Sequence, residues 1–367
     1  MNPLVAMRMK MRDRVLRFYS HDLVKISRKR RARQLLGFKT EHLTPLSTEQ
    51  RDEILSFWKP FRDMTSEMKW FEFYNGLCQD KTKLKHYIPE SVYYTDIDTF
   101  FTIPRRCEEL DDKNMYDLFF GDVKMPRTIV RKTNGVLLDR DYQIITAAQA
   151  LALCKAQGRV ISKEARMSGG GFGVKFFDFS SCSDNEFLDW LAKAREINIQ
   201  EIIKQHDCLN QLHANSINSI RIMSMMLDGE VRLLSSVLRM GRDGSQVDNA
   251  SSGGIACGIL EDGHLREFAC DKTGERLTRH PQGAVFKETK LVGYDKCCEL
   301  VRKLAGRMSS ASHLLSWDFA IDPEGDPVLI EVNLTFGGVT IHQMCNGPIF
   351  GELTETLLDK VYHSNSK

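Results

Sequence analysis

The sequence predicts an α+β protein, because helix-type and hairpin-type segments follow one another without regular alternation. Residues 1–120 show mainly helical spacing of apolar residues, whereas residues 217–272 have the pattern of a long block of strands. The turn-forming pairs Asn134-Gly135 and Asp228-Gly229 each divide two apolar runs, which predicts two antiparallel hairpins. Antiparallel sheets with separate helices are therefore expected, and a simple parallel β-α-β order is not.

The individual elements follow from local signals. A Ser-Thr pair at Ser47 and Thr48 precedes helical apolar spacing and predicts a capped helix over residues 47–62. Strands are expected on both sides of Asn134-Gly135 and over residues 160–165. Further helices are expected over residues 147–157, 294–308 and 352–362.

The composition is typical of a soluble globular protein. The 367 residues suffice for two or three subdomains, and 42% are hydrophobic and 27% charged. No apolar run approaches the length of a membrane span, and the N-terminus lacks an apolar signal core. We therefore expect a cytoplasmic location.

The ten cysteines form no C-x-x-C pair and no Cys/His cluster with zinc spacing. Cys297 and Cys298 are adjacent, which suits neither a disulfide between them nor a zinc site. Reduced, mostly buried thiols are the expectation.

The net charge of +2 hides a strongly basic segment. Residues 8–33 hold eleven Lys or Arg against Asp13 and Asp22, so this segment carries +9 and the rest of the chain carries −7. Its apolar residues fall at helical spacing, which favours a basic amphipathic helix. Either this arm packs on its own domain, or it docks on an acidic partner or on the inner face of an anionic membrane. Nucleic acid is not expected, since no nucleic-acid-binding module follows.

A polar set interrupts the segment SWDFAIDPEGDPVLIEVNLTFGG, residues 316–338. If the turn centres on Glu324-Gly325, Asp318 lies opposite Glu331, and Asn333 shares their face because strand side chains alternate. The other face of the hairpin is predicted to be an apolar wall, in which Trp317, Phe319 and Ile321 face Val332, Ile330 and Val328.

Two opposed carboxylates repel and raise each other's pKa unless a cation lies between them. Two carboxylates and an amide are oxygen ligands that suit a hard divalent ion such as Mg²⁺. The alternative is a half-exposed hairpin whose polar residues face water.

A glycine-rich loop follows the strand that carries Lys163. The loop comprises Ser168, Gly169, Gly170, Gly171 and Gly173, and another strand follows it. Backbone N–H groups of such a loop can surround phosphate oxygens, and a nearby Lys supplies positive charge. Neither a P-loop nor a dinucleotide fingerprint fits, because the Lys precedes the glycines and no helix follows. A flexible hairpin tip is the alternative.

Two arginines lie in strand contexts further along the chain. Arg221 and Arg239 need anionic partners there, since an unpaired guanidinium would be costly. Phosphate oxygens fit, and so do salt bridges to Asp248 or Glu230. A simple register of the Asp228-Gly229 hairpin places the two arginines on opposite faces. Either a bulge intervenes, or only one of them reaches the phosphates.

The order of these elements resembles that of the ATP-grasp superfamily over about residues 120–350. It comprises the strand with Lys163, the glycine loop, Gln200-Glu201, N-x-x-R, R…D-N…G-G and D…E-x-N. The chain is most similar to the sugar-transfer-associated branch. The resemblance implies two α+β subdomains that grip ATP. Residues 121–205 would form the one with the lid loop, and residues 206–367 the catalytic and metal-binding one. Residues 1–120 would remain a helical N-terminal region with the basic arm.

The resemblance also implies roles for the residues above. Lys163 would bind the α- and β-phosphates under the lid loop, and Gln200, Glu201 and Ile203 would line the adenine and ribose pocket. Arg221 and Arg239 would contact the γ-phosphate or an acyl-phosphate, with Asn249 and Gly253-Gly254 on the acceptor side. Asp318, Glu331 and Asn333 would hold one or two Mg²⁺, with Mn²⁺ as an alternative.

The chain departs from the family pattern in its N-terminal region, where the expected α/β domain is not recognisable in residues 1–120, and at two places in the site. The residues after Asn333 read LTFGG instead of a small-residue-Pro-Gly turn, which puts the acceptor pocket in doubt. A second phosphate-binding cation has no clear match, and Lys124, Arg127 and Arg131 are its candidates.

The implied activity is ATP- and Mg²⁺-dependent ligation of a carboxylate to an amine, one of them sugar-linked, in cell-surface polysaccharide or related conjugate synthesis. A phosphotransferase acting on a small molecule or sugar and a non-catalytic nucleotide-binding scaffold are the alternatives.

Overall fold

The computed structural model describes residues 26, 29–30, 43–166, 173–249, 252–335 and 337–364. The predicted basic helix over residues 8–33 lies outside the described residues, apart from Ile26, Lys29 and Arg30.

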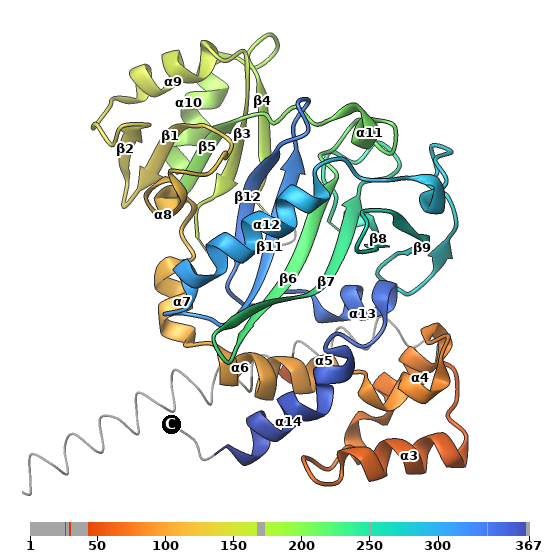
Figure 1. Cartoon of the computed structure of the whole chain (residues 1–367). Helices are drawn as coiled ribbons and strands as arrows, with labels where there is room; N and C mark the ends of the chain where they lie inside the picture. The colour runs from red at the N-terminus through yellow and green to blue at the C-terminus, as the bar shows by residue number, and fades with distance from the viewer. Residues whose placement is uncertain are drawn as a thin grey trace, which may run out of the picture.

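Two antiparallel sheets organise the described chain (Figure 1). The five-stranded sheet has the order β2-β1-β5-β3-β4, built from β1 (Thr128–Thr133), β2 (Val136–Asp139), β3 (Arg159–Glu164), β4 (Lys175–Asp178) and β5 (Ile197–Glu201). The seven-stranded sheet has the order β10-β9-β8-β7-β6-β11-β12, built from β6 (Ser219–Leu227), β7 (Glu230–Met240), β8 (Ile255–Ile259), β9 (Leu265–Cys270), β10 (Arg276–Leu277), β11 (Leu314–Ile321) and β12 (Pro327–Asn333). This mixture of helices and antiparallel sheets confirms the predicted α+β class.

The five-stranded sheet has its own core, which helices α9 (Ala147–Lys155) and α10 (Asp184–Lys193) cover in the upper left of Figure 1. A capping box at Thr146 starts α9, and the Ser183 side chain caps α10. Along β3, Val160 packs into this core while its alternate neighbours Ile161 and Lys163 face away from it. The sheet thus leaves one face for the cavity described below.

Helix α12 (Tyr294–Leu304), continued by a 3₁₀ turn over Ala305–Met308, covers one face of the seven-stranded sheet. Trp317, Phe319 and Ile321 of β11 pack beneath it, and all three are fully buried. Helices α7 (Pro104–Leu110) and α8 (Tyr116–Phe120) and the short α11 (Asp207–Asn210) contribute to the same core. The apolar wall predicted for β11 is therefore confirmed.

The opposite face packs against the helical N-terminal region and the C-terminal helices. These elements are α3 (Thr48–Trp58), α4 (Met68–Leu77), α5 (Glu90–Val92), a π-helical turn (Tyr93–Ile97), α6 (Asp98–Phe101), α13 (Val339–Asn346) and α14 (Thr354–His363), with short 3₁₀ turns over Thr65–Glu67, Lys81–His86 and Gly351–Leu353. Two other 3₁₀ turns lie elsewhere: Lys113–Met115 contacts β5, and Phe286–Glu288 contributes Phe286 to the core under α12. Phe71 and Tyr74 of α4 share one core with Met223 and Met225 of β6 and with Leu357 of α14. The helical region and the large sheet therefore form one packed unit.

A β-bulge corrects the predicted register of the β11–β12 hairpin. Asp318 pairs with Glu331 as expected, but Phe319 pairs with Leu329, and Ile330 is the residue skipped between them. Ile330 leaves the apolar wall and lines the cavity instead. The prediction that Phe319 faces Ile330 and that Ile321 faces Val328 was wrong, because the loop spans residues 322–326 and shifts the register by one.

A second bulge lies in the β6–β7 hairpin, between the Ser224↔Leu233 and Met223↔Ser235 pairs. It shifts the simple register by one residue, so that Arg221 pairs with Val237 and Ser219 with Arg239. Arg221 and Arg239 therefore lie on the same face of the sheet, which is the bulged alternative of the prediction.

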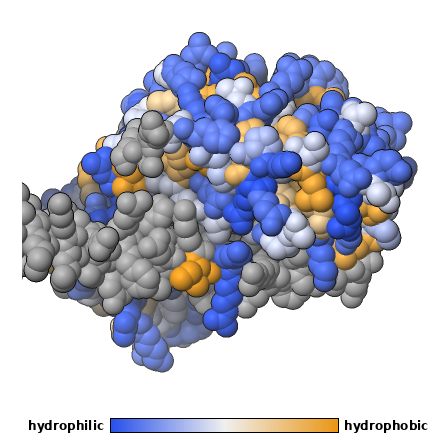
Figure 2. Space-filling model, turned by 90° about the horizontal axis from the view of Figure 1, so that it is seen from below, coloured by the Kyte–Doolittle hydropathy of each residue, from blue (hydrophilic) through white to orange (hydrophobic). Residues whose placement is uncertain are grey.

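In the view from below, the coloured surface is mainly hydrophilic, with hydrophobic side chains in small groups (Figure 2). In the part of the chain that was described, no helix is both long and apolar enough to cross a membrane. All ten cysteines are free thiols and eight are buried, as expected.

The shared core predicts that the N-terminal region does not unfold by itself. Phe71→Ala should lower the free energy of unfolding by about 3–5 kcal/mol, because it removes a fully buried ring from that core. Urea unfolding followed by far-UV and near-UV dichroism should show one shifted transition.

The matched control is Ile144→Ala, since Ile144 is 79% exposed and its truncation should change stability by less than about 0.5 kcal/mol. Two separate transitions in Phe71→Ala, one of them at the wild-type midpoint, would contradict a single packed unit.

Candidate functional site

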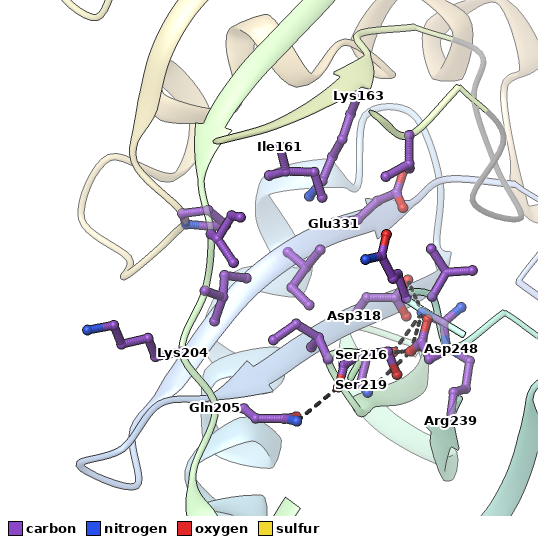
Figure 3. A pocket seen from close by; sticks show the side chains of 18 of the residues that line it. Ile161, Lys163, Lys204, Gln205, Ser216, Ser219, Arg239, Asp248, Asp318 and Glu331 are labelled. Carbon is purple, nitrogen blue, oxygen red and sulfur yellow. Dashed lines mark hydrogen bonds and ion pairs between the residues drawn. The ribbon is translucent and has the colours of Figure 1, made fainter. Parts of the chain in front are cut away.

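A cavity of about 610 Å³ lies between the two sheets. Strand β3 and the segment after β5 supply one side, and β6, β7, β11 and β12 supply the floor. In Figure 3, Lys163 points into the cavity from one side, while Asp318, Asp248 and Arg239 gather on the other. One cleft therefore collects residues from segments more than a hundred positions apart.

An ion pair between Arg221 and Asp318 forms the centre of the floor. Arg221 donates from Nε to Oδ1 at 2.7 Å and from one terminal nitrogen to Oδ2 at 2.6 Å. Burial would raise the pKa of Asp318, but the charges of Arg221 and Arg239 lower it to about 2. The carboxylate is thus ionised at neutral pH although it is only 2% exposed.

Arg239 joins this pair from the neighbouring strand. Its guanidinium donates to Ser219 Oγ at 2.7 and 3.0 Å and lies 3.3 Å from Asp318 Oδ2 and 3.5 Å from Asp248 Oδ2. Ser219 in turn donates to Asp248. The alternative of a salt bridge to Asp248 is present for Arg239, and Arg221 pairs with Asp318 rather than with Glu230.

Glu331 has a different cationic partner. Lys113, which is 7% exposed, places its Nζ 2.7 Å from Glu331 Oε1. The backbone N–H of Lys113 donates to the carbonyl of Ala165, at the end of β3, so this residue docks on the five-stranded sheet. The expected repulsion between Asp318 and Glu331 is therefore offset by protein cations, Arg221 and Arg239 at Asp318 and Lys113 at Glu331.

Lys163 lines the cavity from β3. Desolvation, together with the charge of the nearby Lys113, lowers the pKa of its amine to about 8, whereas Glu331 acts in the opposite direction. An anion at this position would restore the protonated form.

The other end of the cavity is more apolar. Ile161, Phe176, Ile203 and Ile330 line it together with Glu201, which ends β5. Arg127 contacts Glu201 through its side chain at 3.3 Å. The chemistry of this end suits a flat apolar ring with polar edges. The end with Lys113, Lys163, Arg221 and Arg239 suits a polyanionic group.

Most of the predicted site residues meet in this cavity. Those that line it are Lys163, Glu201, Ile203, Arg221, Arg239, Asn249, Asp318, Glu331 and Asn333. Gln200 does not line it; its side-chain amide lies 3.5 Å from the carbonyl of Pro126. Gly253 and Gly254 do not line it either.

The lid-loop residues Ser168, Gly169, Gly170 and Gly171 lie outside the described residues. Gly173 is described, with a φ of 75°. A Cβ there would lie 2.5 Å from Cγ of Glu164, so both its backbone and its surroundings require glycine.

Comparison with known families decides the identity of this fold. The model of the family described as sugar-transfer associated ATP-grasp matches residues 98–357. The chain belongs to this family. Its two sheets are accordingly those of the ATP-grasp fold, as the sequence predicted.

Similarity to individual proteins is distant. No curated protein matches the sequence. D-alanyl-alanine synthetase A from Vibrio cholerae O1 biovar eltor str. N16961 is 14% identical over 72% of this chain and 64% of that one, with a TM-score of 0.38. An L-amino acid ligase from Bacillus licheniformis is 14% identical over 70% and 48%, with a TM-score of 0.41. A D-cycloserine synthetase is 12% identical over 80% of each chain, with a TM-score of 0.42. The chain thus spans less than two thirds of the first two structures.

Lys113 is one of the charged cavity residues that the sequence reasoning missed. None of the three candidates for a second cation lines the cavity: Lys124 pairs with Asp322, Arg127 with Glu201, and Arg131 with Asp117. Lys113 was overlooked because it lies in a short 3₁₀ turn before the first strand, within a segment assigned to the helical region. Its only sequence signal is a Lys inside the turn-like LDDKN segment.

The candidate metal ligands Asp318, Glu331 and Asn333 supply oxygen atoms, but all three side chains already contact other protein groups. No group of three or more His, Cys, Asp or Glu side chains suited to a metal is found among the described residues. Asn333 directs its amide nitrogen to Asp318 Oδ2 and to the Ser316 carbonyl, both at 3.4 Å, so its amide oxygen is turned away from these two oxygens. The side-chain oxygens of Glu331 and Asn333 thus suit a hard cation whose other ligands are phosphate and water. Asp318 could become a further ligand if its ion pair with Arg221 opens.

His342 of α13 lies buried beneath the Arg221–Asp318 pair, and its environment predicts that the stability of the fold falls at acid pH. Burial, together with the charges of Arg221 and Arg239, lowers the pKa of His342 to about 3, although Asp318 acts in the opposite direction. Its Nδ1 contacts Ser235 Oγ at 2.9 Å, and its Nε2 has no partner among the described residues. The neutral ring is therefore part of the folded state.

Because the unfolded chain binds the proton more readily, the stability from His342 is present above about pH 6.5 and is lost as the pH falls. In denaturant titrations at several pH values, the wild type should lose about 1.4 kcal/mol per pH unit more than His342→Asn below about pH 6.5. His264→Asn, at a half-exposed histidine, serves as control and should keep the wild-type slope. Equal slopes for wild type and His342→Asn would refute the buried neutral ring.

Proposed function

We propose that the protein is an ATP- and Mg²⁺-dependent carboxylate–amine ligase that acts through an acyl-phosphate. The observation that carries the proposal is the convergence of Lys113, Lys163, Arg221 and Arg239 on one end of the cavity, beside an apolar end of the right chemistry for adenine. Membership of the ATP-grasp family supports ATP as the nucleotide.

The two lysines would bind phosphate oxygens from the side of the five-stranded sheet. Lys163 would hold the α- and β-phosphates, and binding there would raise the pKa of its amine from about 8. Lys113, 2.7 Å from Glu331, is positioned to exchange that carboxylate for a phosphate oxygen. Ile203 and Glu201 would bind the adenine and ribose, and Gln200 would support this segment from outside the cavity.

Arg221 and Arg239 would stabilise the charge that develops during phosphoryl transfer. A carboxylate oxygen of the substrate attacks the γ-phosphorus, the bond to the β–γ bridging oxygen breaks, and ADP leaves. The amine then attacks the carbonyl carbon of the acyl-phosphate, loses a proton, and inorganic phosphate leaves. Asn249, at the cavity edge next to Asp248, is the residue we assign to the acceptor side.

Asp318, Glu331 and Asn333 would hold Mg²⁺, or Mn²⁺ in its place. The ion supplies charge neutralisation on the phosphates and a fixed orientation for them. Asp318 remains ionised for this task because Arg221 keeps the pKa of its carboxyl low.

The family description associates these proteins with sugar transfer, which supports a sugar-linked carboxylate or amine as one substrate. Synthesis of cell-surface polysaccharide or a related conjugate in the cytoplasm is the process we propose. This part rests on association with the family and not on the geometry of the site.

An ATP-consumption screen of amino acids against acidic sugars, with mass spectrometry of the products, tests the reaction. The proposal expects ADP, phosphate and an amide. ADP with a phosphorylated product would establish a kinase instead, and nucleotide binding without any turnover would establish a scaffold. Each of these two results would overturn the ligase proposal.

Glu331→Gln should reduce turnover on the order of a thousandfold, because it removes a charged ligand of the divalent ion. Steady-state ATP hydrolysis at saturating Mg²⁺ provides the measurement, and the far-UV dichroism should match that of the wild type. Glu324→Gln, on the exposed tip of the same hairpin, is the matched control and should keep full activity.

Asp318→Asn should abolish turnover and also destabilise the fold by about 3–5 kcal/mol, since it leaves Arg221 buried without a carboxylate. Near-normal turnover in both Glu331→Gln and Asp318→Asn would contradict the assignment of the metal ligands.

A further inference from the structure

A second cavity, of about 1000 Å³, lies on the side of the molecule where the segment after α4 meets β9 and the C-terminal end of α13 (Figure 1). It shares no lining residue with the cavity between the sheets. Nothing in the proposed ligase reaction uses it.

Arg266 of β9 is held in place at this cavity by a neutral partner. Its Nε donates to Asn346 Oδ1 at 2.7 Å, and the Asn346 amide donates to Ser235 Oγ and to the Ser236 carbonyl, both at 2.9 Å. A Cβ on Gly258 would lie 2.7 Å from Arg266 Cδ and 2.2 Å from Asn346 Oδ1. Glycine at this position therefore permits Arg266 to cross β8 and reach Asn346.

Arg276 of β10 faces the same cavity and is also held by neutral groups. Its guanidinium carbon lies 3.9 Å from the centroid of the Phe268 ring, and one terminal nitrogen donates to the Leu77 carbonyl. Within the described part of the chain, no carboxylate lies within ion-pair distance of Arg266 or Arg276. The structure thus fixes two guanidinium groups, that of the half-buried Arg266 and that of the exposed Arg276, without a carboxylate partner among the described residues.

The lining also contains acceptors. Glu267 and Glu352 border the cavity without pairing with either arginine. Carboxylates accept hydrogen bonds from hydroxyl groups, whereas guanidinium groups match the geometry of carboxylate and phosphate. A ligand that satisfies both sets carries an acidic group and several hydroxyls.

We propose that the second cavity binds a polyhydroxylated anion, a sugar acid or a sugar phosphate, whose acidic group is held by Arg266 and Arg276. Glu267 and Glu352 receive hydrogen bonds from its hydroxyls. Because inorganic phosphate has no sugar hydroxyls to donate to these two carboxylates, the site favours the sugar derivative over inorganic phosphate.

Calorimetric titrations of the full chain with four probes test this site: glucuronate, glucose 1-phosphate, glucose and inorganic phosphate. Glucuronate and glucose 1-phosphate should bind, and glucose and inorganic phosphate should bind at least about tenfold more weakly. The titrations are run with and without ADP and Mg²⁺, and binding at the second cavity should be the same in both.

Arg276→Gln should weaken both anionic probes at least about tenfold. Arg266→Lys keeps the charge but loses the planar fork, and it should weaken them as well while the thermal unfolding temperature stays close to that of the wild type. Arg195→Gln, an exposed arginine in neither cavity, is the matched control and should bind as the wild type does.

Three results would overturn the proposal. The first is binding of neither anionic sugar, or equal binding of glucose. The second is unchanged affinity in Arg276→Gln and Arg266→Lys. The third is displacement of the probes by ADP, which would place them in the cavity between the sheets. None of these depends on whether the protein turns over ATP.

Discussion

The bidentate ion pair between Arg221 and Asp318 is the constraint on which the cavity depends. Two charges buried at this depth are tolerated only because each satisfies the other, and removing either partner would leave an uncompensated charge. The pair also joins β6 to β11 at directly opposite positions. Both neighbouring hairpins carry a bulge, and the bulge between β6 and β7 brings Arg239 onto the face of Arg221. The irregular register is thus what assembles the charged floor.

The remaining charges connect the two sheets. Lys113 is attached by its backbone to the end of β3 and by its side chain to Glu331 of β12, so its ion pair spans the cleft. No ion pair joins Lys163 to another described residue, and desolvation lowers the pKa of its amine. Beneath the floor, α13 extends from Gly338, where an added Cβ would lie 3.5 Å from Arg221, to Asn346 at the second cavity. One short helix therefore contacts both sites.

Sequence reasoning found the residues better than it found their geometry. Asp318 opposite Glu331 was predictable because alternation fixes which strand residues share a face. The placement of Ile330 was not, because a bulge is decided by packing and leaves no clear local signal. Lys113 escaped notice since its position depends on a tertiary contact with Ala165. The shared core of the helical region and the large sheet was likewise hidden, because Phe71 and Met223 are far apart in sequence and meet only on folding.

The most direct test of the account is the proton balance of nucleotide binding. At about pH 8 roughly half of the Lys163 side chains are unprotonated in the free protein, and a bound phosphate should drive them to the charged form. Calorimetry of ADP and Mg²⁺ binding at that pH, in buffers of different ionisation enthalpy, should show uptake of about half a proton. Lys163→Gln should bind more weakly and take up none. Uptake that persists in Lys163→Gln, or the absence of nucleotide binding by the wild type, would contradict the account.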